Sequence, residues 1–207
     1  MAEELGKIKK PEANSFKKGR RLYFIPMVFS SPEAAEEYQA LCTRYWRQVD
    51  EQLDDLEKRL GQATHLYHEL IPQGGPEGLD ACQKLSEASY KILAPRAEKG
   101  AKLEAFEEPS LLTEFIDWTK CLSVGLQNAK VISTVYEAYQ KAHQSRNEHM
   151  VKQIDATLLP EETGVMLIRE GHHLQFPPDI EVFYVSPPAL DEIKRWLRAR
   201  QEESPAQ

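Results

Sequence analysis

The stretch VMLIREGHHLQFPPDIEVFYV, residues 165–185, contains two apolar runs on either side of a polar loop. The first run, residues 165–168, and the second, residues 180–185, are short and apolar enough to be buried strands. The loop between them opens with Arg-Glu-Gly-His-His and contains two prolines, which fit neither a strand nor the interior of a helix. We therefore expect two strands joined by a loop that carries His172 and His173 near its start.

Outside this stretch, further apolar runs alternate with segments of helical periodicity. Strands are expected at 21–29, 63–71 and 101–106, and helices at 32–60, 77–94, 110–157 (divided near Gly125) and from 187 onward. Pro26 predicts that the first strand either lies at a sheet edge or stops early. Ser31 and Pro32 have the residue types of a helix N-cap and first helical position.

This alternation predicts an α/β fold, with a mainly parallel sheet of about five strands covered by helices and a helical segment at roughly 110–157. We expect a single domain over residues 21–200. It would lie between a polar, disordered tail at 1–20 and a frayed C-terminus at 201–207.

The composition limits the classes of partner. The net charge of −7 argues against a general nucleic-acid binder and against an anionic membrane surface. No apolar stretch is long enough to span a bilayer, and the N-terminus has no apolar core of a secretory signal. The three cysteines form no C-x-x-C pair, which suits a reducing compartment. The sequence therefore predicts a cytoplasmic protein without a membrane partner, in which nucleic-acid binding is not expected.

A functional site in such a fold is expected beyond the carboxyl ends of the strands, where ligands bind to open parallel sheets. Glu69 ends the second strand with His68 beside it, and His172 and His173 follow the fourth strand. Glu107-Glu108 follows the third strand, although acidic residues before Pro109 are first of all typical of a helix start.

Arg146 and Asn147 are expected at the same edge of the sheet. Arg146 precedes the end of the long helix by about 10 residues, or ~15 Å along the axis. The strand that follows spans a similar ~16 Å in the return direction. An arginine at this level can bind a carboxylate or a phosphate through two parallel hydrogen bonds.

Each of these residues also has a structural interpretation. Adjacent histidines in a Gly- and Pro-rich loop are often solvated, and Glu69 can be an exposed strand end or an ion-pair partner of Arg146. His143 and His149 lie six residues apart, which does not place them on one helix face as a metal pair.

One segment also resembles a known family. SRNEHMVKQIDATLLPEETGVMLIREGHHL, residues 145–174, resembles the closing motif of the TraB/PrgY and TIKI families, which are grouped with the EreA and ChaN proteins. The matching positions, in order, are Arg146, Asn147, Met150, Ile154, Gly164, Gly171 and His172, with Glu69-Leu70 as the Glu-Leu pair of an early strand. The chain also resembles a bacterial protein group with the same Arg-Asn helix motif followed by Gly, His and Pro-x-Asp-Ile.

The resemblance implies a metal-dependent hydrolase in which Glu69 and His172 have functional roles. It favours His172 over His173, because His172 directly follows the glycine as in the family motif, and His173 is expected to face solvent. The first motif of the family, Gly-x-x-His, is absent, because the first strand ends in FIPMVFSS. The resemblance therefore implies an activity that is reduced or lost.

Two functions from different classes remain open. In the first, Glu69, His172 and either His173 or a carboxylate from residues 104–108 hold Zn²⁺ or Mn²⁺ for hydrolysis of a small-molecule or peptide substrate. Glu69, His172 and Arg146 would be catalytic, Arg146, Asn147 and His68 would bind substrate, and His68 or His173 would move a proton. In the second, the chain is a non-catalytic binding or regulatory protein, Arg146, Glu69 and His172 form a structural network, and helix 32–60 is a partner or homodimer surface.

Overall fold

The computed structural model describes residues 19–203 and has the α/β fold that the sequence predicts. Its five strands all run parallel, in the order β3-β2-β4-β1-β5. Their bounds are β1 Arg20–Pro26, β2 His65–His68, β3 Lys102–Leu103, β4 Thr163–Ile168 and β5 Ile180–Tyr184. Residues 1–18 and 204–207 lie outside the described part, and with them nearly all of the predicted tail and the end of the chain.

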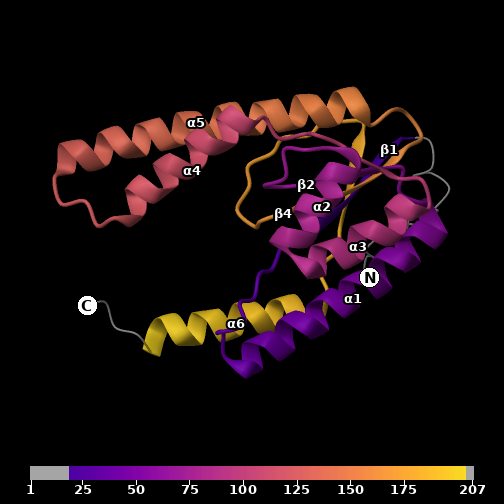
Figure 1. Ribbon diagram of the computed structural model, residues 1–207, viewed down its shortest axis with the longest axis horizontal. Coiled ribbons are helices and arrows are strands. Elements are labelled where there is room, and N and C mark those ends of the chain that lie inside the picture. The colour runs from indigo at the N-terminus through magenta and orange to yellow at the C-terminus, as the bar shows by residue number, and fades with distance from the viewer. Residues whose placement is uncertain (1–18, 204–207) are drawn as a thin grey trace, which may run out of the picture.

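Six helices of the described chain cover the two faces of the sheet (Figure 1). They are α1 Glu36–Leu60, α2 Gly75–Leu85, α3 Glu87–Glu98, α4 Pro109–Ser123, α5 Ala129–Thr157 and α6 Pro188–Glu203. Helices α1, α2, α3 and α6 contribute to the core on one face, and α5 forms the core on the other. None of the helices described in the structure combines the length and apolar character needed to cross a bilayer.

The two central strands, β4 and β1, are buried along their whole length. Their side chains alternate between the two cores: Tyr23 and Ile25 pack with α1, whereas Leu22 and Phe24 pack with α5. Burial on both faces explains why these strands read as continuous apolar runs in the sequence.

The first strand differs in two ways from its expected form. It lies inside the sheet, between β4 and β5, and of the two alternatives for Pro26 the structure has the early stop, because β1 ends there. The strand also begins at Arg20, one residue inside the predicted tail. The guanidinium of Arg20 is 8% exposed and donates two hydrogen bonds of 2.8 Å to Asp179, which fixes it in the sheet.

Two helix starts also differ from the prediction. Helix α1 begins at Glu36 rather than at Pro32, because a turn in which Ala34 N–H donates to the Ser31 carbonyl comes first. The helix expected at 77–94 is two helices, which meet at Ser86. The side chain of Ser86 accepts a hydrogen bond of 3.2 Å from Ser89 N–H, so it caps α3 where α2 ends.

The segments that follow neighbouring strands run over opposite faces of the sheet. The chain leaves β1 and β2 toward the face of α1, α2 and α3, whereas the loop that follows β4 packs Leu174 and Phe176 into the core of α5. The chain therefore leaves β4 toward the face opposite to that used by its neighbours β2 and β1. Such a topological switch point is where parallel sheets form a ligand crevice at the carboxyl ends of their strands.

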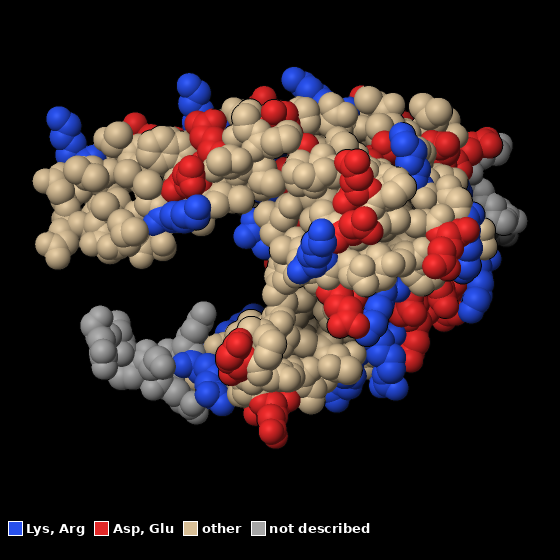
Figure 2. Space-filling view, in the orientation of Figure 1, with Lys and Arg blue, Asp and Glu red and all other residues tan. Residues whose placement is uncertain are grey.

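Helices α4 and α5 extend beyond the sheet as an antiparallel hairpin, and Figure 2 shows a wide open notch between it and α6. The inner part of the hairpin is anchored by Phe115 and Ala142, which are 7% and 3% exposed. No residue between these two is buried. We call the hairpin residues 113–141 the arm.

Candidate functional site

Arg146 is the centre of a buried ion-pair network at the carboxyl edge of the sheet. Its side chain is 2% exposed, and its Nε donates to Glu107 Oε2 at 2.9 Å. Its Nη2 donates to Glu69 Oε1 at 3.0 Å and to Glu107 Oε1. The prediction that Arg146 lies level with the end of the second strand is confirmed, and so is its alternative role as the ion-pair partner of Glu69.

The sequence of α5 explains this placement. Ala142, Arg146, Met150 and Ile154 recur every four residues and form the buried stripe of the helix. The helix is capped by Asn128, whose side chain accepts hydrogen bonds from Lys130 and Val131 N–H. An arginine thus occupies an otherwise apolar helix face, which is tolerated because two carboxylates meet it there.

The carboxylate of Glu69 is held by two guanidinium groups. Oε1 accepts hydrogen bonds from Arg146 Nη2 and Arg169 Nη2, at 3.0 and 3.1 Å. Oε2 accepts from the backbone N–H and the Nε of Arg169, at 2.7 and 3.2 Å. Burial opposes ionisation, but the hydrogen bonds and positive charge of Arg169, together with the charge of Arg146, hold the pKa of Glu69 below its usual value. Glu69 is therefore an ionised carboxylate whose four lone-pair directions are all used.

A cavity of about 200 Å³ opens beside this network. Four residues expected to form the site line it: Glu69, Arg146, Asn147 and His172. Phe115, Met150 and Ile168 form its apolar wall. A larger hollow of about 810 Å³ shares Tyr139, His143, Asn147 and Gly171 with it, so the two spaces adjoin.

Two guanidinium nitrogens of this site have no protein partner among residues 19–203. Arg146 uses Nε and Nη2 in the network, and Arg169 uses Nε and Nη2. The Nη1 of each is left over, and both side chains line the cavity of about 200 Å³. Arg146 is 2% and Arg169 42% exposed, so the two Nη1 groups border a space that a ligand can enter, and both can donate to its oxygen atoms.

His172, the histidine that directly follows Gly171, is half-buried and lines the cavity of about 200 Å³. Its ring packs on Phe24, with centroids 4.6 Å apart, and its Nδ1 accepts a hydrogen bond of 3.2 Å from Leu174 N–H. In the neutral ring the hydrogen is therefore on Nε2. Burial lowers the pKa of His172, against the opposing charge of Glu69, so the neutral form dominates near pH 7.

His173 and His143 border the larger hollow. His173 is exposed, as expected for the second histidine, and its ring lies 5.9 Å from that of His143. Burial and the charge of Arg146 lower the pKa of His143. From the sequence, His143 was compared only with His149, as a metal pair. Its spacing to Arg146 and Asn147 predicts its place at the site, because residues three and four positions apart lie on the same helix face.

His68 does not join the site. Leu66 packs in the core of α1 and Tyr67 in the core of α5, so His68 points with Leu66, away from Arg146. It is fully buried and lines neither space. Its Nδ1 donates to the Glu69 carbonyl at 2.5 Å, and burial lowers its pKa to about 4. His68 was predicted to bind substrate together with Arg146 and Asn147, but the structure does not bring it to their cavity, because adjacent residues of a strand face opposite sides of the sheet.

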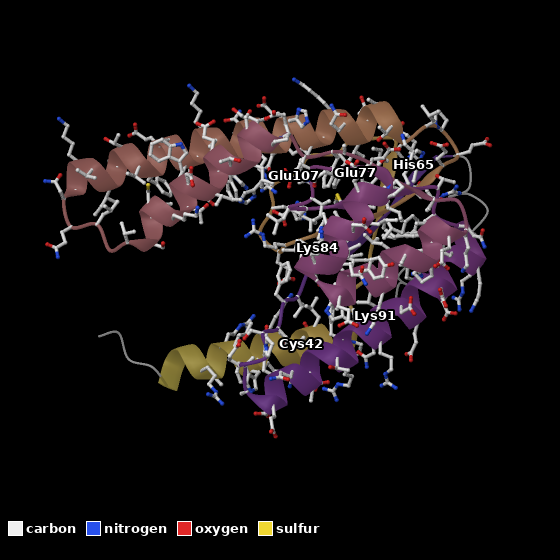
Figure 3. All side chains as sticks on the ribbon, viewed as in Figure 1. Cys42, His65, Glu77, Lys84, Lys91 and Glu107 are labelled. Atoms are coloured by element: carbon white, nitrogen blue, oxygen red, sulfur yellow. The ribbon has the colours of Figure 1, made fainter. Side chains whose placement is uncertain are left out.

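Glu107 belongs to the network, although its place before Pro109 indicated first of all a helix start. Only Glu108 has that role: it caps α4 by accepting a hydrogen bond from Leu111 N–H at 2.7 Å. Glu107 instead turns inward, to Arg146 and to Leu70 N–H at 3.0 Å. Figure 3 labels Glu107 where α5 passes over the end of β2, with His65 toward the opposite end of the sheet.

The residues predicted to hold Zn²⁺ or Mn²⁺ offer few free donor atoms. The oxygens of Glu69 already accept four hydrogen bonds, and two positive charges lie against them. His172 offers Nε2 alone, and His173 is exposed. Among residues 19–203 no group of three or more His, Cys, Asp or Glu side chains has an arrangement suited to a metal. These contacts do not fit a metal bound through Glu69.

The site as a whole is a half-enclosed cavity that presents hydrogen-bond donors beside an apolar wall. Two arginines and two glutamates compensate one another, and the lowered pKa values of His143 and His172 favour their neutral forms near pH 7. Such a site can bind and orient a small molecule that carries acceptor oxygens. No protein-family model, curated protein or solved structure matches the chain.

Proposed function

We propose that the protein binds a small organic carboxylate in the cavity between α5 and the carboxyl ends of β2 and β4, without turning it over. The observation that carries the proposal is the pair of unpartnered Nη1 groups of Arg146 and Arg169 at one cavity. Two oxygens of a carboxylate match two such donors, and donation to an ionised oxygen is the strong form of this bond.

The charge of the site supports a carboxylate rather than a dianionic phosphate. Arg146 and Arg169 contribute two positive charges, and Glu69 and Glu107 contribute two negative charges within contact distance. The network is therefore neutral before a ligand binds. A monoanion adds one negative charge, which two free N–H groups can solvate, whereas a dianion adds two beside the ionised Glu69.

The walls of the site support an organic ligand with an apolar or aromatic body. Phe115 has the guanidinium carbons of Arg146 and Arg169 at 4.7 and 5.9 Å from its ring centroid. Tyr139 and His143 stack at 5.9 Å with nearly parallel rings and line both spaces. A planar group can lie along these rings while its carboxylate reaches the arginines.

The same contacts weigh against the hydrolase that the resemblance implies. Hydrolysis by that route needs Glu69 as a metal ligand or base, and Glu69 is engaged by four hydrogen bonds. Its lowered pKa also makes it a weak base. The binding function uses the network as it stands.

The test is binding of benzoate against benzamide, which has nearly the same shape but no charge. Titration followed by calorimetry and by amide NMR shifts should show benzoate binding to the wild type, with shifts centred on residues 168–174 and on α5 near Arg146. Benzamide should bind at least tenfold more weakly, because it cannot accept two charge-assisted bonds.

Two variants complete the test. Arg169→Gln keeps a donor toward Glu69 but removes the free Nη1, so benzoate affinity should fall about tenfold or more, as expected for one lost charge-assisted bond. Arg195→Gln, at an exposed position of α6, should bind benzoate like the wild type. Equal binding of benzoate and benzamide, or no binding of any small carboxylate, would refute the proposal.

A further inference from the structure

The smaller cavity of the site leaves room for little more than one end of a ligand. Its volume of about 200 Å³ lies below the roughly 300–1,000 Å³ of typical small-molecule sites. The adjoining hollow of about 810 Å³ lies within that range, and its wall continues onto the arm through Tyr136 and Tyr139. A molecule whose carboxylate reaches Arg146 and Arg169 therefore has room for its remainder in the hollow. The groups at the junction of the two spaces decide which atoms can follow the carboxylate.

Asn147 lies at this junction and offers a free hydrogen-bond acceptor. It is 8% exposed and lines both spaces. Its Nδ2 lies 3.4 Å from the Nε2 of His143, and its Oδ1 has no protein partner among residues 19–203. Burial and the charge of Arg146 lower the pKa of His143, so the neutral ring can accept this long hydrogen bond at Nε2. The contact occupies Nδ2 and leaves Oδ1 for a ligand.

A ligand that satisfies these groups carries a hydrogen-bond donor close to its carboxylate. The Nη1 groups of Arg146 and Arg169 are donors, whereas the Oδ1 of Asn147 is an acceptor, and all three side chains line the smaller cavity. In so small a space the carboxylate of the ligand and its donor group can be separated by only a few bonds. A plain carboxylate such as benzoate therefore uses the arginines and leaves Asn147 unpaired.

The donor is a neutral N–H group rather than an ammonium. An ammonium beside two arginines needs a carboxylate of its own. Among the described residues two carboxylates line the smaller cavity, Glu69 and Glu170. Glu69 already accepts four hydrogen bonds, and Glu170 is paired with Lys194 at 2.6 Å. A hydroxyl is also neutral, but it donates only where its oxygen carries no further chain, whereas an amide nitrogen donates and continues into the hollow.

The walls of both spaces suit a chain that carries amides. A carboxamide side chain offers a donor and an acceptor, which are also the two polar groups of a peptide bond. The hollow is lined by four carboxamides: Gln140, Gln144, Asn147 and Gln175. The smaller cavity has an apolar wall made by Phe115, Met150 and Ile168, which can receive an apolar or aromatic side chain.

We propose that the ligand is an α-acylamino carboxylate, the group that an N-acylated amino acid shares with the C-terminus of a peptide, and that Asn147 accepts the hydrogen bond of its amide N–H. The inference rests on the proposed function, because Arg146 and Arg169 bind the carboxylate. The side chain on the α-carbon packs against Phe115 and its apolar neighbours, and the acyl chain runs into the hollow.

Four related compounds test the proposal by titration calorimetry. Phenylpropanoate has the carboxylate and no nitrogen, N-acetyl-phenylalanine adds the amide, phenylalanine has an ammonium instead, and N-acetyl-phenylalaninamide lacks the carboxylate. N-acetyl-phenylalanine should bind about fivefold more tightly than phenylpropanoate, as expected for one added hydrogen bond. Phenylalanine and N-acetyl-phenylalaninamide should both bind more weakly than phenylpropanoate.

The outcomes separate this inference from the proposed function. If phenylpropanoate binds and the acetylamino group adds nothing, the inference is overturned and carboxylate binding stands. Tighter binding of phenylalanine than of N-acetyl-phenylalanine would have the same meaning. If none of the three carboxylates binds, the inference and the proposed function both fail.

Substitution of Asn147 tests whether its side chain provides the gain. In Asn147→Leu the affinity ratio of N-acetyl-phenylalanine to phenylpropanoate should fall to about one. Gln153→Leu is the matched control, because it removes a carboxamide from the same helix outside both spaces, and it should keep the wild-type ratio. Asn147→Asp keeps the acceptor and adds a negative charge, so it should prefer phenylalanine to N-acetyl-phenylalanine. A wild-type preference in Asn147→Asp would overturn the role of Asn147 even if Asn147→Leu fails to fold.

A longer ligand tests the path into the hollow and distinguishes the two sources of the group. Acetyl-glycyl-glycyl-phenylalanine should bind at least as tightly as N-acetyl-phenylalanine, and a gain in affinity would identify the C-terminus of a peptide as the source. Its amide NMR shifts should include Tyr136 and Gln144, which line the hollow but not the smaller cavity. Loss of binding on extension would overturn the proposed path.

Discussion

Arg146 and Glu107 lie 39 residues apart in the chain and form an ion pair that is almost wholly removed from solvent, with side chains 2% and 0% exposed. Glu69 completes the arrangement on the other side of the guanidinium. Because removal from water is costly for each charge, the three groups stabilise the fold only while all of them are present. They also join three parts of the chain, the ends of β2 and β3 and the middle of α5.

Loss of the central arginine should be among the most damaging single substitutions. Arg146→Met leaves Glu107 buried without a counter-charge and Glu69 paired with Arg169 alone, and we expect the free energy of unfolding to fall by about 3–5 kcal/mol. Urea unfolding at pH 7 measures the loss. The triple variant Arg146→Met, Glu69→Gln, Glu107→Gln should recover much of it, because no buried charge is then left unpaired and the side chain of Arg169, 42% exposed, reaches solvent. A triple variant no more stable than Arg146→Met would contradict this account.

Arg96 should be nearly as important on the other face of the sheet. It is 3% exposed and forms ion pairs of 3.0–3.2 Å with Asp50, Asp54 and Glu57 of α1. Arg96→Ala leaves these three carboxylates facing one another and should cost roughly 3 kcal/mol in thermal or urea unfolding. Lys58→Ala is the control, because its pair with Asp55 is 3.7 Å long and exposed, and should cost about 0.5 kcal/mol or less.

His68 should make the protein less stable in mild acid. Its folded pKa of about 4 lies below the ordinary histidine pKa of 6.5, so between these values the unfolded chain binds a proton that the folded chain does not. Stability therefore falls as the pH drops from about 6.5 toward 4, by roughly 3 kcal/mol in total. His68→Asn, whose amide can still donate to the Glu69 carbonyl, should lose this part of the pH dependence in urea unfolding. An unchanged slope between pH 6.5 and 4 in the variant would show that another group is responsible.

Ligand binding should strengthen in the same pH range. His143 and His172 have lowered pKa values and line the cavity beside the proposed carboxylate. Because an anion stabilises the charged imidazole, binding is coupled to proton uptake, and affinity for benzoate should rise as the pH falls below about 6.5. Calorimetry in buffers of different ionisation enthalpy measures the protons taken up. His172→Gln should reduce that number, and a proton count unaffected by this substitution would contradict the assignment.

Removal of metal should leave the fold unchanged. All four lone-pair directions of Glu69 are used by Arg146 and Arg169, so no stabilising metal is expected there. The melting temperature in EDTA should equal that in buffer, and mass spectrometry should find the same metal content in wild type and His172→Ala. One equivalent of zinc or manganese that His172→Ala loses would restore the hydrolase interpretation.

The position of Arg146 at the sheet edge could be predicted from the sequence, because it depends only on the length of the helix and the length of the strand that follows it. Helix rise and strand rise predicted that Arg146 would lie at the carboxyl edge of the sheet, and the structure has it there, bonded to Glu69 at 3.0 Å. The parallel direction of the strands and their coverage by helices followed from the alternation of apolar runs, whereas the order of the strands did not.

Other features depended on choices that single residues do not reveal. Adjacent residues at a strand end look equivalent in a sequence, but only one of His68 and Glu69 can face α5. The two glutamates before Pro109 are of the same residue type and both precede a helix, yet Glu108 caps α4 and Glu107 pairs with Arg146. Ser31 and Pro32 have the residue types of a helix start, and a turn at Ser31–Ala34 delays it to Glu36. The roles of Glu69 and Glu107 depend on tertiary contacts with Arg146, which the local pattern does not contain, whereas the start of α1 depends on a local turn.

The connection from β4 to β5 is a bare loop, although parallel strands are usually joined through a helix. This loop, residues 169–179, begins with Arg169 and His172 at the cavity and ends with Asp179, which holds Arg20 at the opposite edge of the sheet. Its Gly171 has a φ of 85°, a left-handed conformation that suits glycine. With few backbone bonds of its own, such a segment opens more readily than the strands it joins. The edge strand β5 and the helix α6 are thus connected to β4 by a loop whose first residues line the ligand site. A ligand in the cavity should therefore stabilise this loop and slow amide hydrogen exchange along β5 and α6.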